Sequence, residues 1–263
     1  MEDRHPKLTV IIPAYNEERR IGFMLGSYLP YLAAHYPDCV EVLVVINGTT
    51  DRTVEIVSSF LSSYPFLRCI VEPNPVGKGG ALMLGFAAAR GEIVGFVDAD
   101  GATPPDAFDH LVLNLGDAGV ILASRWHPNS RISPQPLSRR IASRLFNRAV
   151  RLLFDLPFSD TQCGAKVLRR EVVQILLPHL GITQWAFDVD LLFQAKRAGF
   201  SILEVPTVWN DVTGSRLNVP RASLEMTMAL IRLRLTYSRL RWIVTGYNRT
   251  LGRWLNFMRR DVA

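Results

Sequence analysis

The chain has 263 residues, of which 48% are hydrophobic and 10% aromatic, so it is long and apolar enough for one large folded domain and is not a disordered protein. No uninterrupted apolar run reaches the roughly 18–20 residues of a membrane-spanning helix, which argues against a chain that crosses a bilayer. Three cysteines in no metal-binding spacing and the absence of a secretory signal favour a reducing, cytoplasmic compartment.

The net charge of +6 is concentrated in the C-terminal segment. Residues 221–263 hold nine arginines, no lysine and two acidic residues, a charge of +7, so the rest of the chain sums to −1. A basic segment of this kind meets either nucleic acid or anionic lipid. Because its arginines alternate with apolar residues, we expect lipid and no nucleic acid. The chain thus divides into a domain over 1–220 and a basic amphipathic tail over 221–263.

Short apolar strands alternate with helices along the first hundred residues. Buried strands are expected at four apolar runs, 8–13, 40–46, 67–71 and 93–97. Helices are expected between them, over 16–34 with Asn16 as the N-cap, from the turn at 47–51 to about 62, and from the glycine-rich segment 74–80 to 90. This alternation predicts an α/β fold with a mostly parallel sheet covered on both faces.

Polar residues follow three of these strands, at 13–17, 47–51 and 98–100. In open α/β sheets, ligands bind at the carboxyl ends of the strands, so these segments are expected to share one site. A long loop is predicted at 124–136, which contains three prolines. Three further polar segments follow, at 160–166, 185–190 and 205–216.

Asp98 and Asp100 follow the strand at 93–97 and are two residues apart, so in extended chain their carboxylates lie on one side. Two carboxylates cannot fill the near-octahedral shell of Mg²⁺ or Mn²⁺, and the remaining positions suit water and phosphate oxygens. Such a cation offsets the charge that develops on a diphosphate leaving group. An isolated D-x-D triplet is often only a polar turn, but two acids at the end of a buried strand need a partner.

Six motifs complete the pattern: PAYNEE at 13–18, GKGGA at 77–81, DADGATP at 98–104, DTQCGAK at 160–166, WAFDVD at 185–190 and GSR at 214–216. In combination they resemble the inverting family 2 glycosyltransferases, which have the GT-A fold. The resemblance runs from about Leu8 to Tyr237. Within the family, the chain is similar to the branches that transfer glucose or mannose to dolichyl phosphate.

The resemblance implies a role for each matching residue. The nucleoside pocket would be lined by Pro13, Ala14, Tyr15 and Glu17. Asp98 and Ala99 would lie near ribose and diphosphate, with Asp100 and Asp98 as ligands of Mg²⁺ or Mn²⁺. The sugar and phosphates would be faced by Gln162, Lys166, Arg125 and Arg216. Many relatives carry an acidic pair after the second strand, where this chain has Ile46-Asn47, and the Asn47 amide could bond the base instead.

Each of three further residues has two possible roles. Lys78 either binds phosphate at a helix N-terminus or lies in a glycine segment that only allows close packing. Asp188 and Asp190 are candidates for orienting donor or acceptor. If their segment opens a helix, they cannot face the same way, and one would be structural. A lipid phosphate acceptor is already anionic near neutral pH, so the reaction does not need a strong general base.

A helix over 222–242 would have two apolar faces. Arg232 and Arg239 would line one boundary between the faces, and Arg234 and Arg241 the other. This pattern suits a helix between protein and lipid, on the cytoplasmic face of a membrane. The alternatives are a packed helix with a solvated edge and the interface of a homo-oligomer.

These features together predict transfer of a hexose, expected to be glucose from UDP-glucose, to a polyprenyl phosphate. A first alternative keeps the chemistry and uses GDP-mannose. A second is a catalytically silent protein that binds nucleotide sugars, and a third uses a soluble saccharide or protein acceptor.

Overall fold

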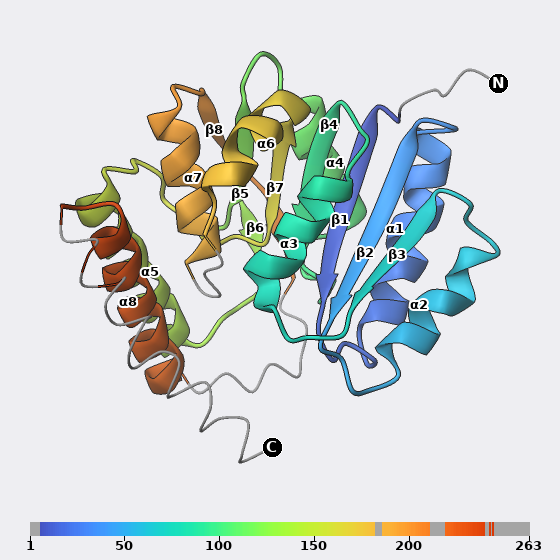
Figure 1. Ribbon diagram of the computed structural model, residues 1–263, viewed down its shortest axis with the longest axis horizontal. Helices are drawn as coiled ribbons and strands as arrows, with labels where there is room; N and C mark the ends of the chain where they lie inside the picture. The colour runs from blue at the N-terminus through green and yellow to red at the C-terminus, as the bar shows by residue number, and fades with distance from the viewer. Residues whose placement is uncertain (1–5, 182–185, 211–218, 240–241, 243, 245–263) are drawn as a thin grey trace.

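The computed structural model describes residues 6–181, 186–210, 219–239, 242 and 244. Its centre is a seven-stranded sheet in the order β3-β2-β1-β4-β7-β5-β8 (Figure 1). The strands are β1 (Leu8–Ala14), β2 (Val40–Asn47), β3 (Leu67–Glu72), β4 (Ile93–Val97), β5 (Val120–Ser124), β7 (Ala165–Arg169) and β8 (Ile202–Pro206). All neighbours pair in parallel except that β7 runs antiparallel to β4 and β5. The predicted mostly parallel sheet is confirmed.

Helices cover both faces of this sheet. One face carries α1 (Ile21–His35), α2 (Thr53–Leu61) and α4 (Pro105–Leu113), and the other α3 (Gly77–Ala88), α6 (Arg170–Leu176) and α7 (Phe187–Arg197) (Figure 1). A 3₁₀ turn follows α6 at Leu177–His179. Side chains alternate along β1, so that Val10 and Ile12 pack toward the first face and Ile11 toward the second. Both faces are buried, which explains the nearly continuous apolar strand sequences.

Two long helices lie side by side beyond the second face, α5 (Leu137–Phe154) and α8 (Val219–Thr236) (Figure 1). Val150 and Phe154 of α5 and Leu230 and Leu233 of α8 belong to the same buried cluster as α3 and α7. The segment that leads into α5 was expected to be a loop. It contains the short strand β6 (Arg131–Ile132), which pairs with β9 (Val208–Trp209). No described helix combines the length and apolar character needed to cross a bilayer.

The first helix begins later than expected. It starts at Ile21, and Asn16 has a φ of 53°, so the prediction of a helix capped by Asn16 is wrong. The side chain of Asn16 instead accepts a hydrogen bond from Thr50 N (2.9 Å), and Glu17 N donates to Thr53 Oγ1 (2.8 Å). These tertiary bonds hold residues 16–20 as a loop beside the end of β2.

Candidate active site

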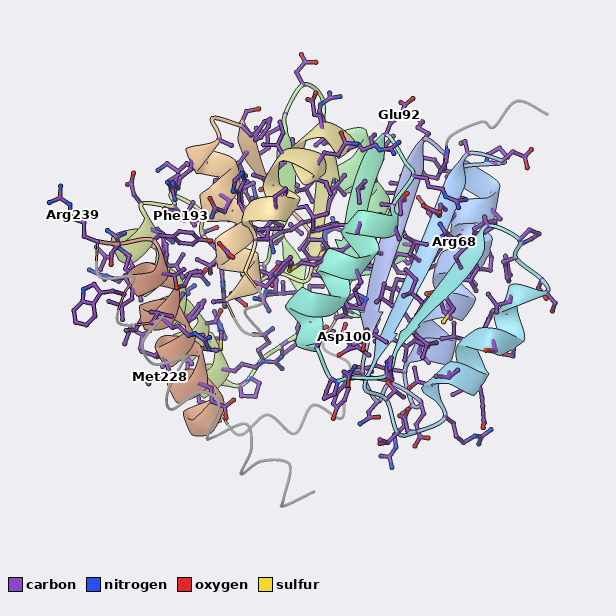
Figure 2. The ribbon with its side chains drawn as sticks, in the orientation of Figure 1. Arg68, Glu92, Asp100, Phe193, Met228 and Arg239 are labelled. Carbon is purple, nitrogen blue, oxygen red and sulfur yellow. The ribbon has the colours of Figure 1, made fainter. Side chains whose placement is uncertain are left out.

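A cleft of about 590 Å³ opens where β1, β2 and β4 end. Figure 2 shows Asp100 at this edge of the sheet. Nine predicted site residues line the cleft: Pro13, Ala14, Tyr15, Glu17, Asn47, Lys78, Asp98, Ala99 and Asp100. Three more line it that the sequence did not single out: Arg20, Pro75 and Gly77. The strand-end rule therefore brings together residues from four separate segments of the chain.

The acidic pair lies directly after β4. Burial raises the pKa of the Asp100 carboxyl, and the negative charge of Asp98 raises it further. Asp98 lies against Gly164, where an added Cβ would come within 2.0 Å of Asp98 Oδ2, so only glycine leaves room for the carboxylate. A carboxylate whose charge is disfavoured, with a second carboxylate beside it, fits a divalent cation. No group of three metal-ligating side chains occurs among the described residues, so water and phosphate oxygens would complete its shell.

Lys78 connects the acidic pair to the rest of the cleft. Its Nζ lies 2.8 Å from Asp98 Oδ1 and 3.3 Å from Asp188 Oδ2. Burial alone would lower the pKa of Lys78, but the charges of Asp188 and Asp98 outweigh it and raise the pKa. The lysine stands in the first turn of α3, where backbone N–H groups attract anions. A phosphate that enters the cleft therefore meets a fixed positive charge.

Lys166 lies beneath this pair and does not line the cleft. It is fully buried, and its Nζ donates to Asp188 Oδ1 (2.6 Å) and to Cys163 O (2.9 Å). Burial would raise the pKa of Asp188, yet the charges of Lys166 and Lys78 hold it below its ordinary value. Lys166, Asp188, Lys78 and Asp98 thus form one chain of alternating charges from the core to the cleft.

Asp190 faces away from the cleft. It stands in the first turn of α7 with Asp188, but its Oδ2 accepts a hydrogen bond from Gly181 N (2.9 Å) and its Oδ1 one from the Tyr237 hydroxyl (2.6 Å). Burial raises the pKa of Asp190, and these two donors offset part of that rise. The two carboxylates of α7 therefore point to different partners, Asp188 to Lys78 and Lys166 and Asp190 to Gly181 and Tyr237.

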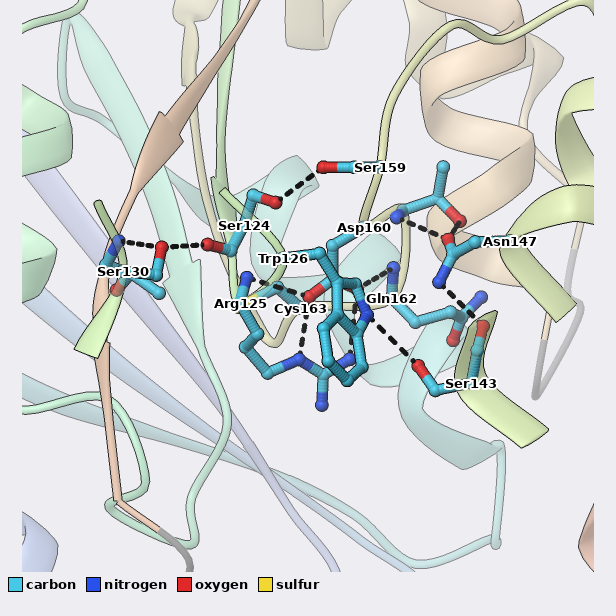
Figure 3. A network of polar contacts seen from close by, with 12 residues as sticks. Ser124, Arg125, Trp126, Ser130, Ser143, Asn147, Ser159, Asp160, Gln162 and Cys163 are labelled. Carbon is cyan, nitrogen blue, oxygen red and sulfur yellow. Dashed lines mark hydrogen bonds and ion pairs between the residues drawn. The ribbon is translucent and has the colours of Figure 1, made fainter. Parts of the chain in front are cut away.

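Arg125 is held by Asp160, a contact that the sequence did not indicate (Figure 3). The guanidinium donates to both carboxylate oxygens of Asp160, from Nε (2.7 Å) and from NH2 (3.0 Å). Asp160 is buried, which would raise its pKa, and the charge of Arg125 lowers it instead. The backbone N–H of Gln162 also donates to Asp160 (3.3 Å). This network fixes the loop that carries Gly164 to Asp98, and neither Arg125 nor Gln162 lines the cleft.

Asn47 joins two elements at the floor of the cleft. Its Nδ2 donates to Ala14 O (3.2 Å), and its Oδ1 accepts from Gly77 N (3.0 Å). The amide therefore ties the end of β1 to the start of α3. One donor hydrogen and one acceptor lone pair remain for a ligand. Arg216 lies outside the described residues.

An open α/β sheet with a cleft at its strand ends, an acidic pair and an adjacent lysine is the arrangement expected of a nucleotide-sugar transferase of the GT-A type. The family model for glycosyl transferase family 2 matches residues 9–176. The chain belongs to this family and is a glycosyltransferase.

Curated relatives cover most of the chain. The dolichyl-phosphate beta-glucosyltransferase of Drosophila melanogaster is 34% identical over 245 residues, which are 88% of this chain and 75% of the relative. The enzyme of the same name from Mus musculus is 33% identical over 250 residues, 90% of this chain and 77% of the relative.

Solved structures of glucosyl-3-phosphoglycerate synthase from Mycobacterium tuberculosis have the same fold. One, in complex with Mn²⁺, UDP and glucosyl-3-phosphoglycerate, has a TM-score of 0.63 at 20% identity and covers 87% of this chain and 80% of its own. Another, in complex with UDP, has a TM-score of 0.61 at 22% identity and covers 88% and 79%. The predicted GT-A fold is confirmed.

Proposed function

We propose that the protein transfers glucose from UDP-glucose to a polyprenyl phosphate, with inversion at the anomeric carbon. The observation that carries this proposal is the cleft in which Asp98, Asp100 and Lys78 meet at the end of β4. Relatives that the chain matches over about nine-tenths of its length are dolichyl-phosphate beta-glucosyltransferases, which supports glucose as the sugar and a lipid phosphate as the acceptor.

Asp100 and Asp98 are the residues that would hold Mg²⁺ or Mn²⁺ against the donor diphosphate. Bound there, the cation neutralises charge on the departing nucleotide. Lys78 adds a positive charge beside Asp98, and the residues at 13–17 with Asn47 hold the nucleoside. An acceptor phosphate oxygen forms the new bond to the anomeric carbon as the bond to the diphosphate breaks, and UDP leaves. Gln162, Arg125 and Arg216 are proposed to approach the sugar and phosphates when substrates are bound.

Asp188 rather than Asp190 is positioned to act on the substrates. It pairs with Lys78, which lines the cleft, and with Lys166 in the core, whereas Asp190 is bonded to Gly181 and Tyr237. Through Lys78, Asp188 sets the charge that faces the diphosphate. Lys166 supports the same arrangement from below.

The tail over 221–263 is proposed to lie on the cytoplasmic face of a membrane beside the catalytic domain over 1–220. In the part of α8 whose side chains are described, Leu230 and Leu233 are buried, whereas Met228 and Ile231 are exposed. Figure 2 shows Met228 and Arg239 at the outer edge of the molecule. One apolar face packed on the domain and a second apolar face left exposed fit the two apolar faces that the sequence predicts for a helix between protein and lipid.

Transfer assays with radiolabelled UDP-glucose and GDP-mannose, each with polyprenyl phosphate and with or without Mn²⁺, test the donor and the acceptor. Transfer from UDP-glucose in a metal-dependent manner is the expected result. Transfer from GDP-mannose alone would identify GDP-mannose as the donor in place of UDP-glucose. Binding of UDP-glucose without turnover on any lipid phosphate would instead identify a silent nucleotide-sugar-binding protein.

A further inference from the structure

Helix α5 exposes a row of large apolar side chains. Leu137, Ile141, Leu145 and Leu152 are 69%, 50%, 63% and 79% exposed. At about 100° per residue these four positions fall within a single stripe of less than a quarter of the helix circumference. The opposite side of α5 is anchored, because Asn147, Val150 and Phe154 are buried in the domain. The stripe is therefore an outward face of a firmly packed helix.

Three arginines line one border of this stripe, and a fourth, Arg148, falls within it. Arg140, Arg144, Arg148 and Arg151 recur three or four residues apart, and the helix has no acidic residue. Among the described residues, none of these four arginines forms an ion pair, although Arg144 lies over the Trp126 ring at 5.0 Å. Exposed arginines without acidic partners suit the anionic headgroups of a lipid surface, and the exposed leucines beside them suit its acyl chains.

The arginine border also lines a hollow. A cavity of about 410 Å³ is lined by Trp126, Arg144, Asn147, Arg148, Arg151 and Ser159. Three guanidinium groups and two neutral polar side chains make a receptor for an anion, with donors in the planar arrangement that suits phosphate oxygens. The hollow is separate from the donor cleft, which shares none of its lining residues.

We propose that α5 is a membrane-binding helix, which inserts its leucine stripe into the interface of an anionic bilayer and binds lipid phosphates with Arg144, Arg148 and Arg151. Charge complementarity selects this partner, because a run of five arginines without an acid repels a second copy of the same face. A stripe of leucines adds apolar insertion that a purely ionic partner does not use. This surface is distinct from the tail over 221–263.

Co-sedimentation with vesicles tests the proposal, using the full chain and no donor or polyprenyl phosphate. The vesicles are phosphatidylcholine alone or phosphatidylcholine with phosphatidylglycerol. Replacing three arginines, Arg144→Gln/Arg148→Gln/Arg151→Gln, is expected to weaken binding to the anionic vesicles roughly 100-fold. The charge-matched control Arg19→Gln/Arg52→Gln/Arg90→Gln removes three exposed arginines that lie outside α5 and should retain most of the binding.

The apolar stripe has its own variant. Leu145→Gln/Leu152→Gln is expected to weaken binding about tenfold at unchanged charge. Leu113→Gln/Val71→Gln, which alters two exposed apolar residues on α4 and β3, should bind like the wild type. Thermal unfolding of each variant checks that the domain remains folded.

Three outcomes would overturn the proposal. The wild type fails to sediment with anionic vesicles. The α5 variants bind as the wild type does, while Arg232→Gln/Arg234→Gln/Arg239→Gln/Arg241→Gln abolishes binding, which assigns the membrane to the tail alone. The α5 variants change the mass of the protein in solution and leave vesicle binding intact, which identifies an interface between copies. Because no sugar donor takes part, none of these outcomes depends on the proposed transferase reaction.

Discussion

At and beneath the donor cleft, Lys78, Arg20 and the buried Lys166 each lie within ion-pair distance of a carboxylate, whereas on α5 four arginines have no such partner among the described residues. The first set is enclosed and balanced. The second is exposed, and it adjoins leucines that water does not stabilise. Balanced charges that are held before a substrate arrives serve a preorganised site. Unbalanced charges on the surface instead require a partner from outside the chain.

Replacing Asp100 with alanine is expected to have the largest effect on activity. Metal-dependent turnover should fall about 1,000-fold or more, because one of the two proposed cation ligands is lost. Steady-state rates measured over a Mn²⁺ titration give the effect. Asp106→Asn is the matched control, since Asp106 is an exposed acid in the first turn of α4, and it should leave the rate unchanged. Equal rates for Asp100→Ala and wild type would show that Asp100 is not a metal ligand.

Lys166→Met tests whether the cleft charges also hold the fold together. Removing the lysine leaves Asp188 buried beside a single remaining cation, so the free energy of unfolding should fall by about 3–5 kcal/mol. Denaturant titration measures this change. Lys196→Met removes the exposed Lys196–Asp155 pair and should cost at most about 1 kcal/mol. A similar loss for both variants would show that burial adds nothing to the Lys166 pair.

The pH dependence of stability isolates Asp188. A carboxylate whose pKa is lowered in the folded state stabilises the protein above its unfolded-state pKa, 3.8 for aspartate, and this stabilisation disappears as the pH falls through the lower folded value. At neutral pH, Asp188→Asn should therefore be less stable than the wild type by about 3 kcal/mol. Below pH 4 the difference should shrink, because the unfolded-state carboxyl of the wild type becomes protonated first, and it should vanish once the pH falls below the lower folded-state pKa. Unfolding titrations at several pH values check this, and a constant difference would contradict it.

The sequence predicted the cleft well because its residues come in short motifs at strand ends. The apolar runs located β1 to β4, and the shared edge of parallel strands then placed Glu17, Asn47, Lys78 and Asp98 together. Contacts between distant residues were not predictable in this way. Arg125 meets Asp160 across 35 residues, and Asn16 meets Thr50 across 34, which is why the helix start was misplaced.

The sequence did not indicate the lipid-facing side of α5, and the reason is different. The charge summed over residues 1–220 is close to neutral. It therefore does not reveal the five arginines of α5, whereas the excess charge of the basic tail is evident. Its apolar positions also look like those of any packed amphipathic helix. Only the exposed fractions of Leu145 and Leu152 reveal that these leucines lie on the outside. Sequence periodicity finds the faces of a helix and does not say which one the domain covers.

Tyr237→Phe removes a hydrogen bond between α7 and the segment after α8, and its expected effect is the smallest. The tyrosine belongs to the segment after α8 and donates a hydrogen bond to Asp190 on α7, the helix that also carries Asp188, the partner of Lys78. Loss of this bond to a partly buried carboxylate should lower the free energy of unfolding by about 1–2 kcal/mol.

Tyr64→Phe is the control, because no described residue bonds the Tyr64 hydroxyl, and it should change stability by only a few tenths of a kcal/mol. If α8 is coupled to the cleft through α7, Tyr237→Phe should also reduce turnover under conditions where the protein stays folded. A loss of stability at full turnover would mean that α8 is only packed against the domain. A loss of both would show that the segment after α8 supports the donor site through α7.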